Sequence, residues 1–473
     1  MYLLLHENVL GVRAVETCIC DNNEKIIKPG IIMPTHFRPY APDQDLLLPP
    51  SLREWLPQGH LAYFISDVID ALDLSVFYAP YEGDGRRNAP FEPRMMLKVL
   101  IYAYASGTFS SRKIAKKLEE DVAFRVLGAG NFPQHRTLCD FRKYHLNDFQ
   151  SMFVQVVQIA REAELIQLGT LAIDGTKVRA NASKHKAMSY GRMQQEEQRL
   201  AQEIAELCAQ AHSTDADEDR LYGADRRGDE LPEELQHRED RLEKIRQAKA
   251  RLEQAQVEAD TARGRHTDDE RKPPRGGRHY KRDFGVPADE AQSNFTDPES
   301  RIMKTADGFQ QCYNGQLTVD DAFQLIVANT LINNASDNGE LIGQVGAIEA
   351  TLGEAPEVVL ADAGYRSEAG LAELENKHID GYVSLRREGK SSGEIDSEEY
   401  PATARMAEKL ASADGQARYA ERKGLVEPVN GWIKNILGFR RFSLRGLQAV
   451  RGEWDLICLA TNLRRMQPLL VIE

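Results

Sequence analysis

The chain has 473 residues, 42% of them hydrophobic and 28% charged, so it is long enough for two or three domains with well-filled cores. No apolar run approaches the roughly 18 residues needed to cross a bilayer, the first residues lack a basic leader, and the six cysteines are too scattered for a disulfide framework or a zinc site. These features exclude a membrane protein and a disulfide-rich secreted protein, and we expect a soluble, cytoplasmic one.

The net charge of -13 at first argues against a nucleic-acid partner, because binding a polyanion calls for an excess of Lys and Arg. The charge is unevenly distributed, however. Acidic residues outnumber basic ones mainly from Gly191 to Glu270, whereas basic residues predominate from Arg418 to Arg451. The acidic average therefore conceals a basic segment near the end of the chain.

The N-terminal part of the chain divides at Met33. Residues 1–32 have weak periodicity, which predicts a poorly ordered leader and makes Met33 an alternative start. Residues 33–165 contain helical patterns, including PRMMLKVLIYAYASG with Pro93 near a helix start and SSRKIAKKLEE with Ser110 or Ser111 as the cap. We expect one all-helical N-terminal domain.

A strand pattern begins near Ile173 and is soon interrupted by a charged stretch. Residues 187–294 are rich in Ala, Glu, Gln, Leu and Arg, with apolar residues at three- and four-residue steps up to about residue 262. This pattern predicts a helical hairpin or coiled coil inserted after the first strand, followed by the exposed linker TDDERKPPRGGRHYKRD.

Strand patterns return in QQCYNGQLTV and AFQLIVANTLI, which we expect to form a hairpin that turns at Asp320 and Asp321. An amphipathic helix capped by Asp337 follows, then the strand in PEVVLADAGYRS, a helix and the strand in GYVSLR. This order is typical of a ribonuclease-H-like mixed α/β sheet. We therefore expect residues 166–186 and 295–465 to form the core.

Two carboxylates end short apolar strands of this core. Asp174 follows LAI and Asp362 follows VVLA, and each is followed within two residues by Gly. Carboxylates held close together repel each other unless a cation lies between them. Mg²⁺ prefers carboxylate oxygens, and two such ions clamp the attacking and leaving oxygens of a phosphodiester.

A third carboxylate is expected from Glu427. If a helix begins near it, Pro428 falls in the first turn and the positive helix end favours the ionised side chain. Lys434 follows two turns later on the same face, where it can meet a phosphate. Simpler interpretations stay open: Asp before Gly is commonly a turn-former, and Glu427, Lys434 and the basic run after them can be ordinary solvated side chains.

Together these motifs resemble the DDE transposases of bacterial insertion sequences, in the group related to the IS-five and IS-eleven-eighty-two elements with an InsH-like N-terminal domain. The resemblance covers nearly the whole chain from Met33 and rests on DGTKVRANAS, YNGQLTVD, LADAGYRS and VEPVNGWIKNILGFRRFSLRGL. Glu427 and Lys434 match the Glu–Lys spacing of the family signature. Tyr419 and Arg422 correspond to its Tyr and Arg, although four residues, not three, separate Arg422 from Glu427.

The resemblance implies that Asp174, Asp362 and Glu427 are the catalytic residues and hold two Mg²⁺ ions, for which Mn²⁺ can substitute. The enzyme would bind the terminal inverted repeats of its element, cleave them by hydrolysis and join the freed 3′-hydroxyl ends to target DNA, as a homodimer in the bacterial nucleoid. The residues expected to contact DNA are Lys434, Arg422, Tyr419, Lys177, Arg440, Arg441 and Arg445 in the core, and Arg112, Lys113, Lys116, Arg136, Arg142 and Lys143 in the helical domain.

Two other functions are compatible with parts of the sequence. A nuclease on the same fold would cut DNA without joining it, but it needs neither the helical domain nor the C-terminal basic signature. A domesticated DNA-binding protein would have lost its active site, whereas here all the acidic residues of the signature are present.

Overall fold

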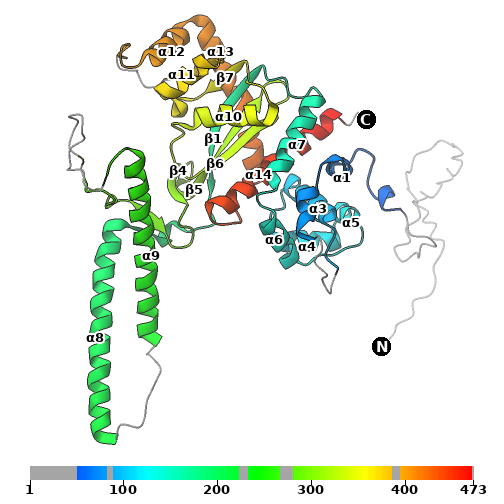
Figure 1. The fold of residues 1–473 in the computed structure, drawn as a ribbon. Coiled ribbons are helices and arrows are strands. Elements are labelled where there is room, and N and C mark those ends of the chain that lie inside the picture. Colours follow the sequence, from blue (N-terminus) through cyan, green and yellow to red (C-terminus); the bar gives the residue numbers. More distant parts are fainter. Residues whose placement is uncertain are drawn as a thin grey trace, which may run out of the picture. The chain divides into compact units, whose positions relative to one another are not determined.

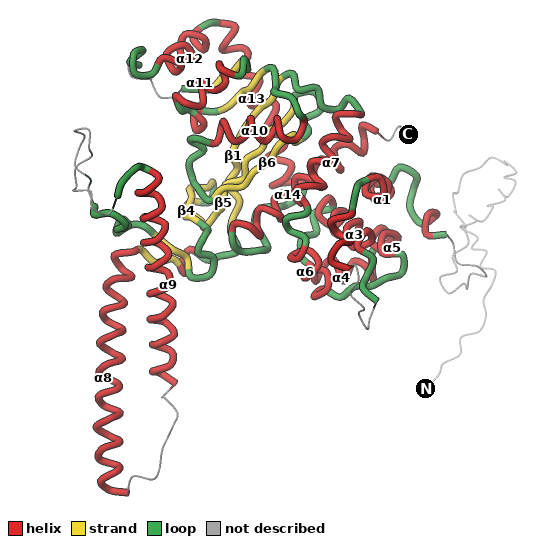
Figure 2. Tube along the Cα trace, in the orientation of Figure 1, coloured by secondary structure: helices red, strands yellow, loops and turns green. Residues whose placement is uncertain are grey.

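The computed structural model describes residues 51–81, 89–222, 233–266, 280, 282–385 and 395–470, and at residues 53, 208–222 and 233–236 it describes the backbone alone. The expected leader and most of the expected linker at 267–283 lie outside these residues. The described chain is a mixed α/β structure with a six-stranded mixed sheet and many helices (Figures 1 and 2). None of the described helices is long and apolar enough to span a bilayer.

The segment before the sheet is helical, as its periodicity predicts. Local capping explains several boundaries: Pro93 occupies the first turn of α3 while Glu92 accepts a hydrogen bond from the Met95 amide, and Asp121 caps α5. Ser110 precedes α4 without a capping hydrogen bond from its side chain. The helices are α1 (Leu61–Ala71), α2 (Ser75–Tyr78), α3 (Pro93–Ala105), α4 (Ser111–Glu120), α5 (Val122–Gly128), α6 (His135–Tyr144) and α7 (Phe149–Glu162).

The main sheet runs in the order β4-β5-β1-β7-β8, and β6 pairs with β5 beyond the end of β4. Strand β1 is antiparallel to β5 and parallel to β7, which is in turn parallel to β8. The expected hairpin is present, with a longer turn than expected, between Asp320 and Ile326. The strands are β1 (Thr170–Arg179), β4 (Arg301–Thr305), β5 (Gly308–Asp320), β6 (Ile326–Ile332), β7 (Val358–Ala361) and β8 (Asp380–Val383).

Helices cover both faces of the sheet. On one face Val426 and Val429 share a buried cluster with Ala172 and Leu360, and the indole of Trp454 packs against the backbone of β5 at Gly315. On the other face Leu341 and Val345 pack with Ile173, Val359 and Ala361. The first face carries α13 (Ala413–Gly431) and α14 (Leu447–Leu470), and the second carries α10 (Glu340–Leu352) and α11 (Glu368–Asn376).

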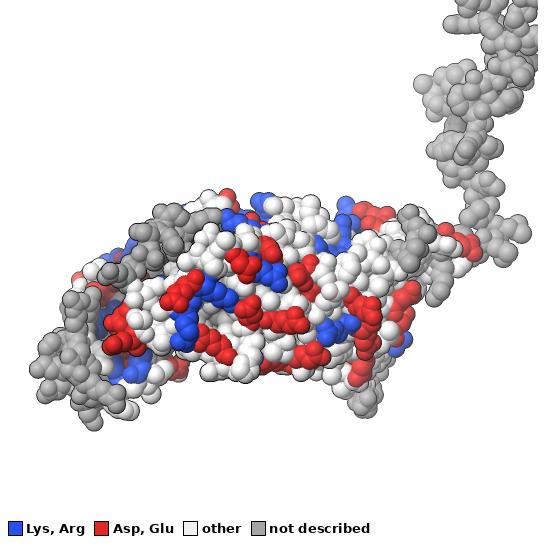
Figure 3. Space-filling model, turned by 90° about the horizontal axis from the view of Figure 1, so that it is seen from above, with Lys and Arg blue, Asp and Glu red and all other residues white. Residues whose placement is uncertain are grey.

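Helix α12 (Pro401–Ala411) packs on α11 and α13. Between β1 and β5 the chain forms two long helices, α8 (Tyr190–Tyr222) and α9 (Glu233–Ala262), whose apolar residues Met193, Leu200, Leu242 and Ile245 share one buried cluster. A small separate sheet pairs β2 (Ala187–Ser189) with β3 (Gln292–Asn294). On the face drawn in Figure 3, acidic and basic side chains are interspersed rather than segregated.

A buried polar network joins the N-terminal helices to the sheet-bearing part. Glu453 on α14 is 0% exposed and accepts hydrogen bonds from the Tyr104 hydroxyl at 3.0 Å and from the amides of Ser443 and Leu444. The Arg142 guanidinium donates to the same Tyr104 hydroxyl at 2.9 Å. Because buried polar groups are costly unless they are hydrogen-bonded, this network favours one arrangement of α3, α6 and α14.

Candidate active site where the pairing of β1 with β7 ends

Strand register brings Asp174 and Asp362 together. The expectation that Asp174 ends its strand is wrong, because β1 continues to Arg179, whereas β7 does end directly before Asp362. Ile173 of β1 pairs with Ala361 of the parallel strand β7, so Asp174 and Asp362 follow at the same level on neighbouring segments. Neighbouring strands are about 4.8 Å apart, and residues at equivalent positions point to the same face. Both carboxylates therefore lie where the pairing of β1 with β7 ends, on the face covered by α13.

The surroundings of Asp174 come from α13. The Asn430 side-chain amide donates to Asp174 Oδ2 at 3.0 Å, and Arg422 Nη1 lies 3.5 Å from Asp174 Oδ1. Burial raises the pKa of Asp174 to about 6; Arg422 opposes this rise, and the nearby Asp362 and Asp337 add to it. The site thus holds a partly buried carboxylate whose negative charge is only partly compensated by the protein.

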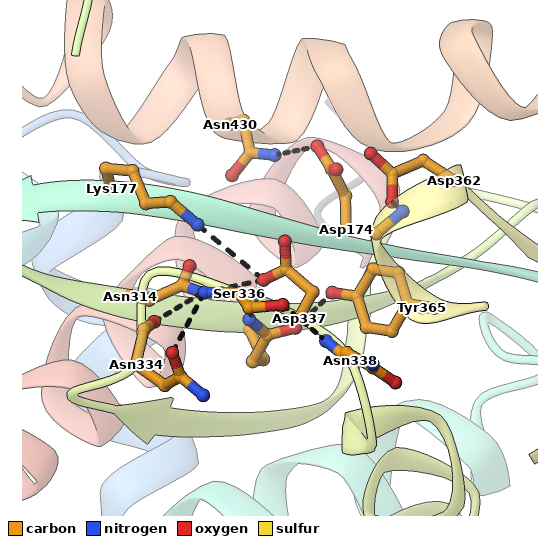
Figure 4. A network of polar contacts seen from close by, with 12 residues as sticks. Asp174, Lys177, Asn314, Asn334, Ser336, Asp337, Asn338, Asp362, Tyr365 and Asn430 are labelled. Carbon is orange, nitrogen blue, oxygen red and sulfur yellow. Dashed lines mark hydrogen bonds and ion pairs between the residues drawn. The ribbon is translucent and has the colours of Figure 1, made fainter. Parts of the chain in front are cut away.

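Asp337 is a third carboxylate beside this pair, and the sequence pattern assigned it another role. The expected helix cap is wrong, because α10 begins at Glu340 after Gly339. Asp337 Oδ1 instead accepts hydrogen bonds from Asn314 Nδ2 at 2.6 Å and Gln316 Nε2 at 2.7 Å (Figure 4). The sequence signal for this contact was the alternation of the amide side chains Asn314 and Gln316 in the buried part of β5.

Glu427 lies on α13, one turn before Asn430. The expectation that a helix begins at Glu427 is wrong, because α13 begins at Ala413 and ends at Gly431. The helix N-terminus therefore does not act on Glu427. Its side chain is exposed and has no hydrogen bond or ion pair within the described residues. Since residues three apart are neighbours on a helix surface, Glu427 lies beside the residue that contacts Asp174.

Pro428 is accommodated inside α13 by a compensating hydrogen bond. Proline has no amide hydrogen, so the Gly424 carbonyl four residues earlier loses its helical partner. Gln324 Nε2 donates to this carbonyl at 3.0 Å. The helix then continues as a π-helical turn from Trp432 to Ile436, which contains Lys434. Burial lowers the pKa of Lys434, and the positive charges of Lys177 and Arg440 contribute to the same shift.

The other residues of the signature lie on the same helix. Arg422 is only 8% exposed, yet its Nε and Nη1 atoms have no hydrogen-bond partner in the described part of the chain. Tyr419, three residues earlier, interacts with the Arg422 side chain. The structure thus brings Arg422 to Asp174, and Tyr419 to Arg422, despite the extra residue before Glu427.

The C-terminal arginines are exposed and held by oxygen atoms of neighbouring segments. Arg440 donates to the Lys434 carbonyl at 3.0 Å and to Asn435 Oδ1 at 2.6 Å. Arg441 donates to Asn181 Oδ1, and Arg445 to the Asn181 carbonyl at 3.0 Å. Within the described residues no carboxylate pairs with these three side chains, so their charges are available to an anion.

Five of the six basic residues expected to contact DNA in the N-terminal helices are exposed. These are Arg112, Lys113 and Lys116 on α4, where Lys116 pairs with Glu120 at 3.5 Å, and Arg136 and Lys143 on α6. Arg142 differs, because it is 4% exposed and donates to the Tyr104 hydroxyl and the Phe109 carbonyl. Its enclosure argues against the expected phosphate contact and makes Arg142 part of the buried network instead.

Lys177 is also engaged within the protein. Its Nζ lies 3.7 Å from Asp337 Oδ1, and both side chains are largely buried, with exposed fractions of 22% and 16%. Lys177 is two residues beyond Gly175 on β1, so its side chain leaves the strand on the same face as Gly175 and opposite to Asp174. This placement favours an internal ion pair over the expected phosphate contact.

The donor set suits a hard divalent cation. Within the described residues, no group of three or more His, Cys, Asp and Glu side chains lies close enough to enclose a metal ion. Asp174 and Asp362 nevertheless supply carboxylate oxygens at neighbouring positions of β1 and β7, and burial raises the pKa of Asp174 because Arg422 only partly compensates the ionised form. Oxygen ligands of this kind are those that Mg²⁺ prefers, and a bound cation would stabilise the ionised carboxylates.

Comparison with known proteins gives two matches to family models. The model described as Transposase domain (DUF772) matches residues 50–144, and the model described as Transposase DDE domain matches residues 261–463. The second match includes Asp337, Asp362, Glu427 and Lys434, whereas Asp174 lies between the two matches. No curated protein and no solved structure matches the chain.

Proposed function

The chain belongs to the DDE transposases of insertion sequences, and we propose that Asp174, Asp362 and Glu427 are the catalytic residues with which it performs their reaction. It is a DNA-binding enzyme that cleaves DNA with divalent metal ions and transfers the cut strand. The nuclease and the domesticated DNA-binding protein are not favoured. The observation that carries the proposal is the parallel register that aligns Asp174 with Asp362.

We propose that the metal is Mg²⁺, bound as two ions and replaceable by Mn²⁺. When bound, the ions would activate a water molecule and stabilise the charge that develops on the phosphodiester oxygens. Asp174 would hold them from β1 and Asp362 from the end of β7, and Glu427 would complete the set from α13. The position of Glu427 supports this role, because Glu427 lies one helical turn before Asn430, whose side chain donates a hydrogen bond to Asp174.

The remaining side chains of the signature would orient the DNA. Within the described residues, Nε and Nη1 of Arg422 have no hydrogen-bond partner, and such donors beside Asp174 suit the oxygens of a phosphate. Tyr419 would fix the Arg422 side chain. Lys434, Arg440, Arg441 and Arg445 would continue the phosphate path beyond the carboxylates. Lys177 would not contact DNA directly but would pair with Asp337 within the protein.

The strand order supports a ribonuclease-H-like core. Strands β6, β5 and β1 are consecutive antiparallel neighbours, and β7 and β8 follow parallel to β1, with β4 as an addition at the edge. We propose the domain division expected from the sequence: a leader (1–32), an end-binding helical domain (33–165), the core (166–186 and 295–465), and an inserted charged helical segment with its linker (187–294).

The finer biological setting is also proposed. The chain would belong to the group of the IS-five and IS-eleven-eighty-two elements, act as a homodimer on the bacterial nucleoid, recognise the terminal inverted repeats of its own element and join them to target DNA. Exposed basic residues on α4 and α6 support end binding by the helical domain. These side chains are Arg112, Lys113, Lys116, Arg136 and Lys143.

The test uses the full chain and a plasmid that carries the inverted repeats found on either side of its coding sequence. Wild-type protein with Mg²⁺ should cut at the repeat ends and join the 3′-hydroxyls to a second plasmid, and Ca²⁺ should support binding without cutting. Asp174→Asn, Asp362→Asn and Glu427→Gln should each lower cleavage by at least about 100-fold and retain DNA binding. Normal cleavage by one variant removes that residue from the assignment.

Glu421→Gln provides a matched control for Glu427→Gln. Glu421 lies on the same helix, is exposed and pairs only with the nearby Arg418 at 2.8 Å among the interactions described. It should cleave at the wild-type rate. Cutting without joining by the wild-type protein would support the nuclease instead.

A further inference from the structure

We propose that Asp337 is a positioning residue for DNA cleavage, which holds in place the two backbone segments that carry Asp174 and Asp362. The inference rests on the proposed function, because it assigns Asp337 a role in the reaction at that site. Asp337 lies in the loop between β6 and α10, far in sequence from both segments, and its side chain is 16% exposed.

Asp337 supports β1 from behind the reacting face. Gly175 is paired with Gln316 and Lys177 with Asn314 across β1 and β5, so these residues share the face opposite to Asp174. Asp337 meets this face, and Figure 4 shows its carboxylate on the other side of β1 from Asp174. Its Oδ1 atom accepts hydrogen bonds from the side chains of Asn314 and Gln316, and these bonds attach the loop that carries Asp337 to β5.

Glycine at position 175 makes this contact geometrically feasible. A Cβ atom at Gly175 would lie 2.4 Å from Asp337 Oδ1, closer than real Cβ atoms approach any neighbour. The residue directly after Asp174 must therefore lack a side chain for Asp337 to reach the strand. Packing against Asp337 therefore explains why glycine follows Asp174, in addition to the preference of Asp-Gly for turns.

The same carboxylate also contacts the segment after Asp362. A Cβ atom at Gly364 would lie 2.9 Å from Asp362 Oδ1 and 3.0 Å from Asp337 Oδ2. Both carboxylate oxygens therefore lie close to Gly364. The next residue, Tyr365, is 0% exposed and donates its hydroxyl to Gln316 Oε1. Gln316 thus connects Asp337 to Tyr365 and fixes the turn that begins at Asp362.

An aspartate satisfies several buried groups at once. Asn314 and Gln316 are both 0% exposed, and buried amide donors are costly when they lack an acceptor. Asp337 Oδ1 accepts from both and lies 3.7 Å from the Lys177 ammonium, which offsets its charge. The loop before α10 is therefore locked onto β1, β5 and the turn after β7 together.

This arrangement predicts an effect on the chemical step rather than on DNA binding. In-line cleavage requires the carboxylates of β1 and β7 to keep their separation, and a misplacement of about 1 Å can cost about 100-fold in rate. Among the described residues, the basic side chain that pairs with Asp337 is Lys177, which faces away from Asp174 and is not proposed to contact DNA. Loss of Asp337 should thus lower the rate at saturating DNA and leave DNA affinity unchanged.

The experiment compares Asp337→Ala with Asp337→Asn in the full chain. The probe is a duplex of the inverted repeat that flanks the coding sequence, with cleavage measured at saturating duplex and Mg²⁺. Asp337→Ala should cleave about 10- to 100-fold more slowly, with the wild-type dissociation constant and salt slope. Asp337→Asn keeps the oxygen that accepts from Asn314 and Gln316, so it should restore most of the rate.

Three results would overturn the inference. A wild-type cleavage rate for Asp337→Ala would show that the contacts of Asp337 with β1, β5 and the turn after β7 are not needed for cleavage. Equal losses for Ala and Asn, with a higher Mg²⁺ requirement, identify Asp337 as a metal ligand instead. A parallel loss of rate, DNA affinity and melting temperature identifies a general scaffold residue.

Asp321→Ala is the matched control. Asp321 is exposed and lies at the opposite end of β1, where its amide bonds the Thr170 carbonyl, so its substitution should leave the rate unchanged. Failure of the wild-type protein to cleave would refute the proposed function. Normal wild-type cleavage with a fully active Asp337→Ala variant refutes only the role of Asp337.

Discussion

Gly175→Ala tests the packing behind the active site without touching a proposed catalytic residue. The new methyl group would lie 2.4 Å from Asp337 Oδ1, 2.9 Å from Gln316 Nε2 and 3.1 Å from Asn314 Oδ1, whereas ordinary Cβ contacts are 3.4–4 Å. Gly175 does not have a positive φ, so alanine can adopt its backbone conformation. Any effect must therefore come from crowding.

The size of the effect follows from how firmly these neighbours are held. Asp337 Oδ1 is bonded to both amides, so it cannot move away alone, and either this group or β1 must shift by about 1 Å. Overpacking of this kind costs about 1–3 kcal/mol of stability. A similar displacement of Asp174 should lower cleavage by about 10- to 100-fold.

The assay measures cleavage of the inverted-repeat duplex at saturating Mg²⁺, together with DNA affinity and melting temperature. Gly346→Ala is the control, because Gly346 lies within α10 and no atom lies within 4 Å of its added Cβ. Alanine there should preserve cleavage and stabilise the helix by about 0.5–1 kcal/mol. Gly175→Ala with wild-type cleavage and melting temperature would refute the crowding argument and weaken the role of Asp337.

Three further predictions concern charge. Because the pKa of Asp174 is raised to about 6 from 3.8, the folded protein binds this proton more tightly; the associated stability is present below about pH 4 and lost as pH rises through 6. In EDTA, the free energy of unfolding of Asp174→Asn should therefore be higher than that of the wild type by up to about 3 kcal/mol at pH 7.5 and by little at pH 4. A difference in melting temperature that does not change with pH would contradict this. Replacing Arg440 and Arg441 together by Ala should weaken binding to end and non-end DNA alike and flatten the slope of log affinity against log salt by up to about 0.9 per lost contact; an unchanged slope with a much lower melting temperature would indicate structural braces. Arg142→Ala should destabilise the protein by about 3 kcal/mol because it breaks the buried network at Tyr104 and Glu453. Replacement of the exposed Lys143 by Ala should not destabilise it. A stable Arg142→Ala variant with a reduced salt slope of DNA binding would instead support a contact between Arg142 and phosphate.

Local pattern predicted many of the elements of this protein. Apolar periodicity predicted the helices before β1, and short apolar runs predicted strands at LAI and VVLA; Asp362 does follow the end of β7, whereas β1 continues past Asp174 to Arg179. These signals are visible in sequence because they depend on residues a few positions apart. The Glu–Lys spacing likewise indicated the family before any fold was known.

Contacts between distant segments were decided only by the tertiary structure. The pairing of Ile173 with Ala361 makes Asp174 and Asp362 neighbours, and the loop before α10 brings Asp337 behind them. The sequence around Asp337 is the same whether its side chain caps a helix or accepts hydrogen bonds from a distant strand, so local sequence does not distinguish the two roles. Its role depends on the amides of β5, which lie more than one element away in the chain.

Burial and helix boundaries were decided in the same way. Arg142 resembles its neighbour Lys143 in sequence, but α6 turns it toward Tyr104 and the buried Glu453 of α14. Pro428 suggested a helix start, yet α13 continues through it because Gln324 supplies the hydrogen bond that proline lacks. Sequence by itself determined which residues are chemically able to bind metal and DNA. Long-range packing decided which of them face the site, because only the folded chain brings distant donors and acceptors within bonding distance.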